Sequence, residues 1–162
     1  MSEHKATIKW QRTSPDFLKG RYSREHTWTF DGGATVPASA APAVVPAPWS
    51  NPAGVDPEEA FVAALSSCHM LTFLHLASKA GFQIDSYADE AVGLVAKNEK
   101  SVPWVSLVTL NPKIVYGGGK LPTPADEERL HHLAHEQCFI ANSVKTEVVI
   151  GKDGVSPSLT KQ

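Results

Sequence analysis

The longest apolar stretch of the chain lies near its middle and has clear start and stop signals. Asp56 is suited to cap a helix, Pro57 fits its first position, and Glu59 completes a capping-box pattern. Gly81 is suited to the left-handed conformation that ends many helices. About 24 residues therefore form one helix about 36 Å long. Because residues 60–76 are apolar nearly all round, we expect this helix to be buried on most sides, partly by a second subunit.

Shorter segments on both sides of this helix have the alternation of β-strands. The predicted elements before it are strands at residues 5–12 and 22–30, a hairpin turn at Asp31-Gly32-Gly33, and a short strand at residues 34–36. Those after it are strands around residues 83–97 and 102–116, a break at Gly117-Gly118-Gly119, a helix from Thr123-Pro124 to about Cys138, and a strand at residues 145–151. The predicted order is β-β-β-α-β-β-α-β, which is an α+β fold.

Residues 37–55 interrupt this pattern with a run rich in proline and alanine. Proline lacks the amide donor that ladders and helices need, so this segment is predicted to be a long, semi-extended loop. Loops of this length are usually either functional or disordered, and both interpretations stay open. We expect a single domain over residues 1–151 that includes this loop, followed by a frayed tail at residues 152–162.

The composition of the chain argues against a nucleic-acid-binding protein and a membrane protein. A chain of 162 residues with 42% hydrophobic side chains is long enough for one domain with a sizeable core. Its net charge of −2 argues against a nucleic-acid surface, which needs clustered basic residues. The polar N-terminus has no apolar signal region, so we expect a cytoplasmic protein. Ser66, Ser67, His69 and Thr72 interrupt the apolar helix, which is therefore predicted to be a buried helix and not a membrane span.

Two cysteines are the main candidates for chemistry. Cys68 lies within the apolar helix and Cys138 near the end of the second predicted helix. A free buried cysteine most often acts as a small hydrophobic residue, and a reducing cytoplasm argues against a permanent disulfide. However, Ser66, Ser67 and His69 make the surroundings of Cys68 more polar than packing requires. The pair therefore suggests redox chemistry, in which the two thiols form a disulfide during turnover.

A reactive thiol must ionise, and that requires a nearby positive charge. Cys68 lies well past the first helical turn, so the helix dipole does not stabilise its thiolate. The candidates for the cation are Arg21 and Arg24, beside an aromatic-rich strand. Arg24 would share a strand face with Tyr22, His26, Trp28 and Phe30.

Other polar residues allow two interpretations each. His131, His135 and Cys138 are spaced to share a helix face, and this spacing suits a metal, but such histidines are more often surface residues. Glu58 stands at the start of the apolar helix, where a carboxylate favours the helix dipole by about 0.3–1 kcal/mol.

Two motifs resemble one known family. The segment from Asp56 to Cys68, DPEEAFVAALSSC, is similar to the N-P-E-x-L-hydrophobic-A-A-x-x-x-x-C helix of the OsmC/Ohr proteins, the osmotically inducible and organic-hydroperoxide-resistance proteins. Glu136-Gln137-Cys138 is similar to the segment that carries the second cysteine of that family. The predicted order of strands and helices also fits the family over nearly the whole chain.

The resemblance implies an OsmC/Ohr-like fold, an intertwined homodimer and a thiol peroxidase that reduces organic hydroperoxides. It implies that Cys68 is the peroxidatic thiol, that Cys138 is the resolving thiol, and that Glu58 partners an arginine of the N-terminal hairpin. We choose Arg24 for that arginine, with Arg21 as the alternative. No bound cofactor is expected, because an external dithiol would reduce the disulfide. The expected apolar walls of the site are Phe61, Met70, Leu71 and Trp49.

The chain also departs from the family pattern. Phe139 follows the second cysteine where the family often has proline, and His69 follows the first where phenylalanine is common. The alternative function is therefore a non-enzymatic module that binds an apolar ligand, or a metal through His131, His135 and Cys138.

Helix geometry suggests that a site of this kind is shared between two chains. Glu58 and Cys68 are about 15 Å apart along one helix. One arginine side chain does not easily reach both, so we expect the site to be assembled across the dimer.

Overall fold

The computed structural model describes residues 1–151. The chain divides into two compact units, Met1–Ala60 and Phe61–Gln162. The expectation of one domain over residues 1–151 stays a prediction, and the expected frayed tail at residues 152–162 lies outside the described residues.

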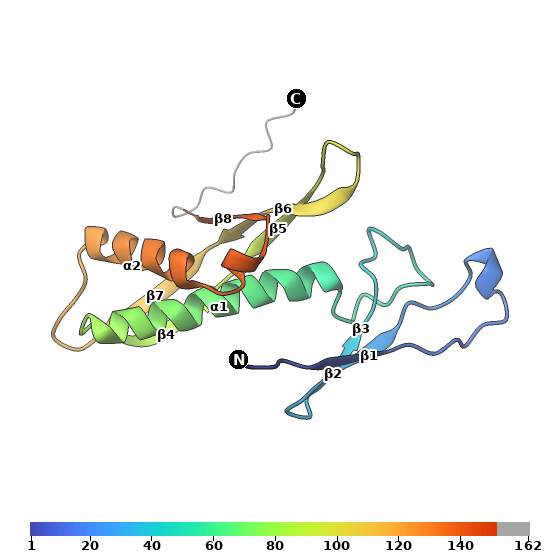
Figure 1. The fold of residues 1–162 in the computed structure, drawn as a ribbon, viewed down its shortest axis with the longest axis horizontal. Helices are drawn as coiled ribbons and strands as arrows, with labels where there is room; N and C mark the ends of the chain where they lie inside the picture. The colour runs from blue at the N-terminus through green and yellow to red at the C-terminus, as the bar shows by residue number, and fades with distance from the viewer. Residues whose placement is uncertain (152–162) are drawn as a thin grey trace. The chain divides into compact units, whose positions relative to one another are not determined.

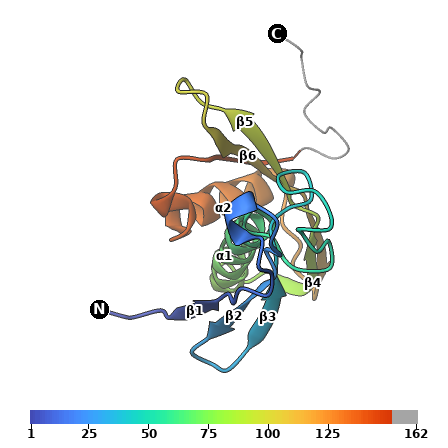
Figure 2. The ribbon, with the colours of Figure 1, turned by 90° about the vertical axis from the view of Figure 1, so that its right-hand side faces the viewer.

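The first unit is built on a small antiparallel sheet in the order β1-β2-β3 (Figure 2). Its elements are β1 (Ala6–Lys9), the 3₁₀ helix η1 (Phe17–Lys19), β2 (His26–Phe30) and β3 (Thr35–Ala38). The predicted hairpin turn is confirmed. Gly33 has φ of 87°, and its N–H donates to the Phe30 carbonyl at 2.9 Å. Glycine adopts this backbone conformation without a steric penalty.

The strand predicted at residues 22–30 begins later, at His26. The backbone before it bonds outside the sheet. The Arg24 N–H donates to the Trp49 carbonyl at 2.9 Å, and the Trp10 indole N–H donates to the Ser23 carbonyl at 2.8 Å. Since these groups are used by a loop and a side chain, the ladder cannot extend through them.

The proline-rich loop is anchored back onto β3. The fully buried Ser39 donates its N–H to the Val55 carbonyl at 3.1 Å and accepts the Asn51 N–H on its hydroxyl at 2.9 Å. A Cβ at Gly54 would lie only 3.0 Å from the backbone of Ala38, so the close approach of the two segments favours glycine there. The loop therefore has specific hydrogen-bonded contacts with the sheet.

Helix α1 (Pro57–Lys79) has the predicted ends. The Glu59 N–H donates to the Asp56 carboxylate at 2.7 Å, and the Asp56 N–H donates to the Glu59 carboxylate at 3.1 Å. At the other end Gly81 has φ of 80°. The amide that follows it donates to the Ala77 carbonyl at 3.0 Å, as in a Schellman motif.

Only one stripe of α1 is buried within a single chain. The buried residues are spaced by four and are Leu65, His69, Phe73 and Ala77. By length and hydropathy the helix is apolar enough to cross a membrane, and 22% of its most apolar window is buried. Leu71 is 62% exposed. The expectation of burial on most sides is therefore not met by one chain, because its other elements cover one face of the helix.

Two sheets accompany α1 in the second unit (Figure 1). Their strands are β4 (Gln83–Asp89), β5 (Val92–Lys97), β6 (Pro103–Leu110), β7 (Pro112–Gly117) and β8 (Glu147–Ile150). One sheet is the antiparallel pair β4-β7, and the other has the order β5-β6-β8, in which β6 and β8 are parallel.

Each of the two long strands predicted after α1 is two strands. The first is divided at Glu90 and Ala91, and the second at Asn111. The Asn111 N–H donates to the Asp89 carboxylate at 2.6 Å, and its side-chain amide donates to the Glu90 carbonyl at 2.9 Å. These bonds tie the two divisions together, so the chain changes sheets at both places.

Helix α2 (Pro124–Gln137) begins where predicted, after Thr123, and Thr123 and Asp126 form a reciprocal capping box. Its buried residues Leu130 and Ala134 join Phe73 of α1 in one core cluster. A second cluster is formed by Leu65, Val108 and Leu110. The 3₁₀ helix η2 (Ala141–Ser143) follows α2 and leads toward β8 (Figure 1).

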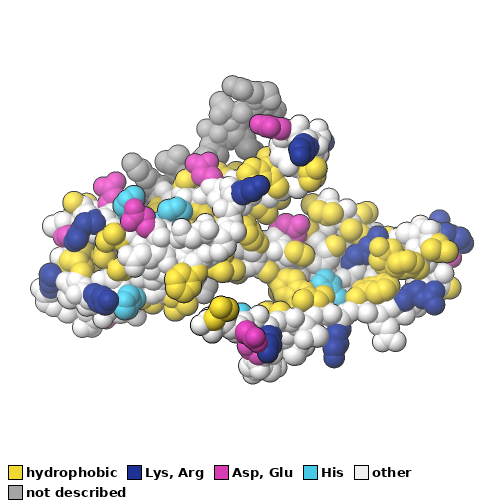
Figure 3. Space-filling model, viewed as in Figure 1, with side chains coloured by type: hydrophobic (Ala, Val, Ile, Leu, Met, Phe, Trp, Pro, Cys, Tyr) yellow, Lys and Arg dark blue, Asp and Glu magenta, His cyan; other side chains and the backbone are white. Residues whose placement is uncertain are grey.

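Charged side chains of both signs are interspersed with hydrophobic ones on the face in view (Figure 3). This distribution accords with the net charge of −2.

Candidate active site

The two cysteines meet where α2 ends. Cys68 is half-buried on α1, and Cys138 is the C-terminal cap of α2 with an exposed fraction of 1%. Both are free thiols, and the Cys68 thiol lies close enough to Cys138 to raise the pKa of its side chain. The Cys138 sulfur also accepts the Ala141 N–H at 3.4 Å. Two residues far apart in the sequence are therefore adjacent in the fold.

The two thiols differ in burial, and the more buried one is not the one that the sequence predicted. The sequence predicted a dry, buried Cys68, whereas Cys138 is the more buried of the pair. Burial raises the pKa of Cys138 to about 11, and the nearby Cys68 thiol acts in the same direction. Cys138 is therefore a protonated thiol at neutral pH.

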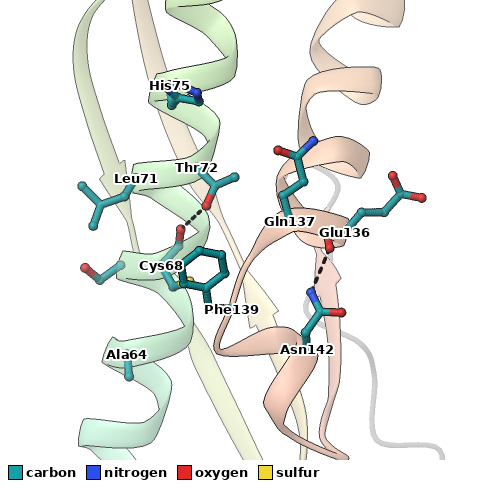
Figure 4. A pocket seen from close by; sticks show the side chains of 10 residues that line it. Ala64, Cys68, Leu71, Thr72, His75, Glu136, Gln137, Phe139 and Asn142 are labelled. Carbon is teal, nitrogen blue, oxygen red and sulfur yellow. Dashed lines mark hydrogen bonds between the residues drawn. The ribbon is translucent and has the colours of Figure 1, made fainter. Parts of the chain in front are cut away.

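A groove of about 850 Å³ opens over Cys68. Its lining residues come from α1 and from the segment around Cys138, and they are Ala64, Ser67, Cys68, Leu71, Thr72, His75, Glu136, Gln137, Phe139 and Asn142. Phe139 is 84% exposed, and its ring lies in front of Cys68 in Figure 4. Apolar groups therefore surround the more accessible of the two thiols.

Side-chain bonds to the backbone hold both sides of the groove. The Thr72 hydroxyl donates to the Cys68 carbonyl at 2.9 Å. On the other side, the Asn142 amide donates to the carbonyls of Glu136 at 2.8 Å and Cys138 at 2.9 Å (Figure 4). The turn between α2 and η2, which carries Cys138, is ordered by this asparagine.

The groove is polar at its other end. His75 lies two helical turns from Cys68 on the same face of α1, and Gln137 lines the opposite side (Figure 4). The Glu136 carboxylate points away and pairs with the His132 imidazole at 3.2 Å. The polar groups directed into this end are therefore an imidazole and an amide.

Of the four apolar walls predicted, Leu71 is among the residues that line the groove. Phe61 instead packs against the cluster of Leu65 and Val108. Met70 does not line the groove, and Trp49 belongs to the first unit. Phe139 was noted in the sequence only as a departure from the family pattern.

Arg24 and Glu58 both lie in the first unit. The Arg24 guanidinium donates to the carbonyls of Tyr22 and Gly20, and its Cζ lies 3.7 Å from the centre of the Tyr22 ring. Glu58 is half-buried in the first turn of α1. Among residues 1–151 of a single chain these two side chains form no salt bridge, and their pairing stays a prediction about the dimer.

The first unit has a hollow of its own, of about 480 Å³, near Arg24. Three aromatic rings, those of Trp10, Phe17 and Tyr22, pack together there, with centroids 4.6–5.7 Å apart. Arg24 is thus presented from an aromatic cluster, although the backbone around it is not a strand.

A buried histidine pair joins α1 to α2. The His69 Nε2 and His131 Nδ1 atoms are 3.0 Å apart, and the rings are nearly parallel, with an interplanar angle of 12°. The exposed fractions are 2% and 8%. Burial lowers the pKa of His69 to about 4, helped by the positive charges of His131 and His135, and burial also lowers the pKa of His131. The sequence did not predict this pair, because its partners are in different helices.

The metal site considered for His131, His135 and Cys138 has no geometric support. Each side chain is turned to a different environment: His131 bonds His69, His135 is exposed and Cys138 lies beside Cys68. Within the described part of the chain, no three side chains of histidine, cysteine, aspartate or glutamate are grouped to hold a metal ion.

Comparisons with known proteins point to one family. Residues 50–151 match the family described as OsmC-like protein. The structure is similar to that of an OsmC-like protein of unknown function from Vibrio cholerae, with 56% identity and a TM-score of 0.90, over 93% of this chain and 99% of that one. A comparison with curated protein sequences gives no match.

More distant structures share the fold. An organic hydroperoxide resistance protein, OsmC, from Legionella pneumophila has 15% identity and a TM-score of 0.66, over 94% of this chain and 98% of that chain. The organic hydroperoxide resistance protein OhrB of Bacillus subtilis has 20% identity and a TM-score of 0.62, over 93% and 98%.

Proposed function

The chain belongs to the OsmC-like family, and from that premise we propose that it is a thiol-dependent peroxidase that reduces organic hydroperoxides. The observation that carries the proposal is the pair of adjacent free thiols, of which one opens on an apolar groove. Two proteins of the same fold are described as organic hydroperoxide resistance proteins. A general role in redox stress is thus supported by the family, and peroxidase activity is the specific proposal.

The first step is attack of the Cys68 thiolate on the hydroperoxide. The sulfur bonds to the terminal peroxide oxygen, the O–O bond breaks, and the alkoxide leaves as an alcohol after taking up a proton. Cys68 becomes a sulfenic acid, so the sulfur is oxidised and the peroxide is reduced. The accessibility of Cys68 in the groove suits this role.

In the second step the Cys138 sulfur attacks the Cys68 sulfenic acid. The two sulfurs bond, and the hydroxyl leaves as water with the Cys138 proton. An external dithiol then returns both thiols by exchange and is itself oxidised to a disulfide. The cytoplasm supplies such dithiols, and no bound cofactor takes part in this scheme.

The thiolate of Cys68 requires a cation, which we assign to Arg24 in an intertwined homodimer. In this arrangement Arg24 pairs with Glu58, and at least one of them faces the Cys68 of the other chain. Single-chain α1 leaves much apolar surface uncovered, which supports a second subunit on it. Arg21 is the alternative cation.

Stoichiometric cumene hydroperoxide tests the function directly. We expect one disulfide per chain between Cys68 and Cys138, detected by peptide mass spectrometry without reduction. Cys68→Ser should abolish peroxide consumption, and Cys138→Ser should complete one turnover and then over-oxidise Cys68. If the groove only binds apolar ligands, both thiols will stay free and Cys68→Ser will match the parent, and the peroxidase proposal fails.

A further inference from the structure

The His69–His131 hydrogen bond lies between the same two helices that carry the thiols. His69 follows Cys68 directly on α1, and His131 precedes Cys138 by two turns of α2, or about 10 Å. We propose that this buried bond is a positioning device that holds α1 and α2 in the register at which Cys68 and Cys138 form a disulfide, an inference that rests on the two-thiol function proposed above.

A single contact between α1 and α2 would still allow one helix to rotate or slide against the other. The thiol contact and the imidazole contact together prevent this. The thiol contact lies at the C-cap of α2, where the backbone leaves the helical conformation. The imidazole contact lies within the helix, between side chains with exposed fractions of 2% and 8%. Together they determine both the rotation and the axial position of α2 against α1.

The imidazole bond is directional, whereas the contacts around it are not. The core cluster that joins the helices consists of apolar side chains such as Phe73, Leu130 and Ala134, which tolerate small shifts. Among residues 1–151 the His69–His131 bond is the one side-chain hydrogen bond between α1 and α2. Its strength depends steeply on distance and angle, so it selects one arrangement from many that pack nearly as well.

The rings also constrain one another. Their planes are nearly parallel, with centroids 5.3 Å apart, and the centre of the Phe73 ring lies 4.4 Å from that of the His131 ring. With both imidazoles neutral, one nitrogen donates and the other accepts, so the bond satisfies both buried atoms that form it. Any shift of α2 would leave these atoms unpaired in the core.

If the histidine bond aligns the helices, it should raise the effective concentration of each of the two thiols toward the other, which can be measured. Reduced protein is equilibrated with glutathione buffers, and one glutathione disulfide converts the two protein thiols to a disulfide and yields two glutathione thiols. The equilibrium constant reports how well Cys68 and Cys138 are aligned. Glutathione disulfide is the oxidant, so the result does not depend on hydroperoxide reduction. The measurement therefore separates this inference from the proposed function.

The test compares His131→Leu and His131→Asn with His132→Gln as the matched control on the exposed face of α2. Loss of the bond in His131→Leu should lower the equilibrium constant about tenfold or more. Asparagine places a polar atom near the position of the imidazole Nδ1, so His131→Asn should recover much of the parent value. His132→Gln should match the parent.

The double variant His69→Phe/His131→Leu leaves no unpaired imidazole in the core. It therefore distinguishes an effect on the alignment of the two thiols from a loss of folding stability. Thermal unfolding of each reduced variant is measured in parallel. We expect the double variant to fold and still to show the lowered equilibrium constant. If the folded double variant, or His131→Leu, keeps the parent constant within about twofold, the bond is merely structural and the proposal is overturned.

Discussion

The two cysteine side chains at the junction of α1 and α2 differ in burial and in their access to the groove. Burial keeps Cys138 protonated, with a pKa of about 11, while Cys68 opens on the groove. A thiol that is protected until a sulfenic acid forms beside it avoids direct oxidation by peroxide. The buried location of Cys138 therefore suits a resolving role better than a peroxidatic one.

The buried His69 predicts an acid-sensitive fold. Its pKa is about 4 in the folded chain and about 6.5 when unfolded, so below pH 6.5 the unfolded state binds more protons. Stability is thus lost as the pH falls from 6.5 towards 4, by about 2 kcal/mol between pH 7 and pH 5. His131 adds to this effect, since burial lowers its pKa despite the opposing charges of Glu127 and Asp89.

Urea unfolding at pH 7 and pH 5 measures this loss in the parent and in His69→Phe. The variant carries no titrating group at this position, so its acid-induced loss should be smaller by about 2 kcal/mol. Equal losses in both proteins would mean that His69 is not the group that titrates.

At the level of the helices and the turns between them, Phe139 places an aromatic ring of the groove next to Cys138. It follows Cys138 on the turn after α2 and lines the groove over Cys68. A largely exposed ring there gains contact area when an apolar substrate binds. In the proposed peroxidase, the segment that carries Cys138 would therefore also contact the substrate.

Phe139→Ala should weaken the use of bulky hydroperoxides selectively. We expect kcat/KM for cumene hydroperoxide to fall about tenfold, from the loss of about 1.4 kcal/mol of apolar contact, while the value for hydrogen peroxide hardly changes. Phe139→Leu, which keeps an apolar side chain, should lose less. A similar loss for both peroxides would indicate that Phe139 supports the turn and not the substrate.

The C-terminal end of α1 offers a test of local backbone energetics. Gly81 has φ of 80°, and a Cβ there would meet nothing closer than the Lys120 ammonium at 3.6 Å. Gly81→Ala should therefore cost about 1–2 kcal/mol of unfolding free energy through backbone strain alone. Gly32→Ala is the matched control, because Gly32 has open space and no positive φ. Equal stabilities of the two variants in urea would contradict this account of the cap.

For the molecule as a whole, the central expectation is a site shared by two chains. One chain covers one stripe of α1, and Arg24 and Cys68 belong to different compact units. Mixing inactive Cys68→Ser subunits with inactive Arg24→Ala subunits should restore activity, because one site of each heterodimer regains both groups. Proven heterodimers without activity would mean that each chain builds its site alone.

Local sequence was sufficient for the helix ends and the hairpin turn. The capping box at Asp56, the helix start at Thr123, the left-handed Gly81 and the turn at residues 31–33 were all predicted. Each depends on hydrogen bonds or dihedral angles within a few residues, which the neighbouring side chains determine. The two cysteines were also identified from the sequence, because they are the residues capable of thiol redox chemistry. The groove residue Leu71 was identified because it is apolar and lies near Cys68 on the same helix.

Tertiary structure decided whatever depends on partners far apart in the chain. The division of the long strands at Glu90 and Asn111 follows from bonds between the two divisions. The burial of Cys138 and the bond between His69 and His131 exist only because α2 packs on α1. No periodicity records such pairings, since hydrogen bonds and desolvation between distant segments arise only when the chain has folded.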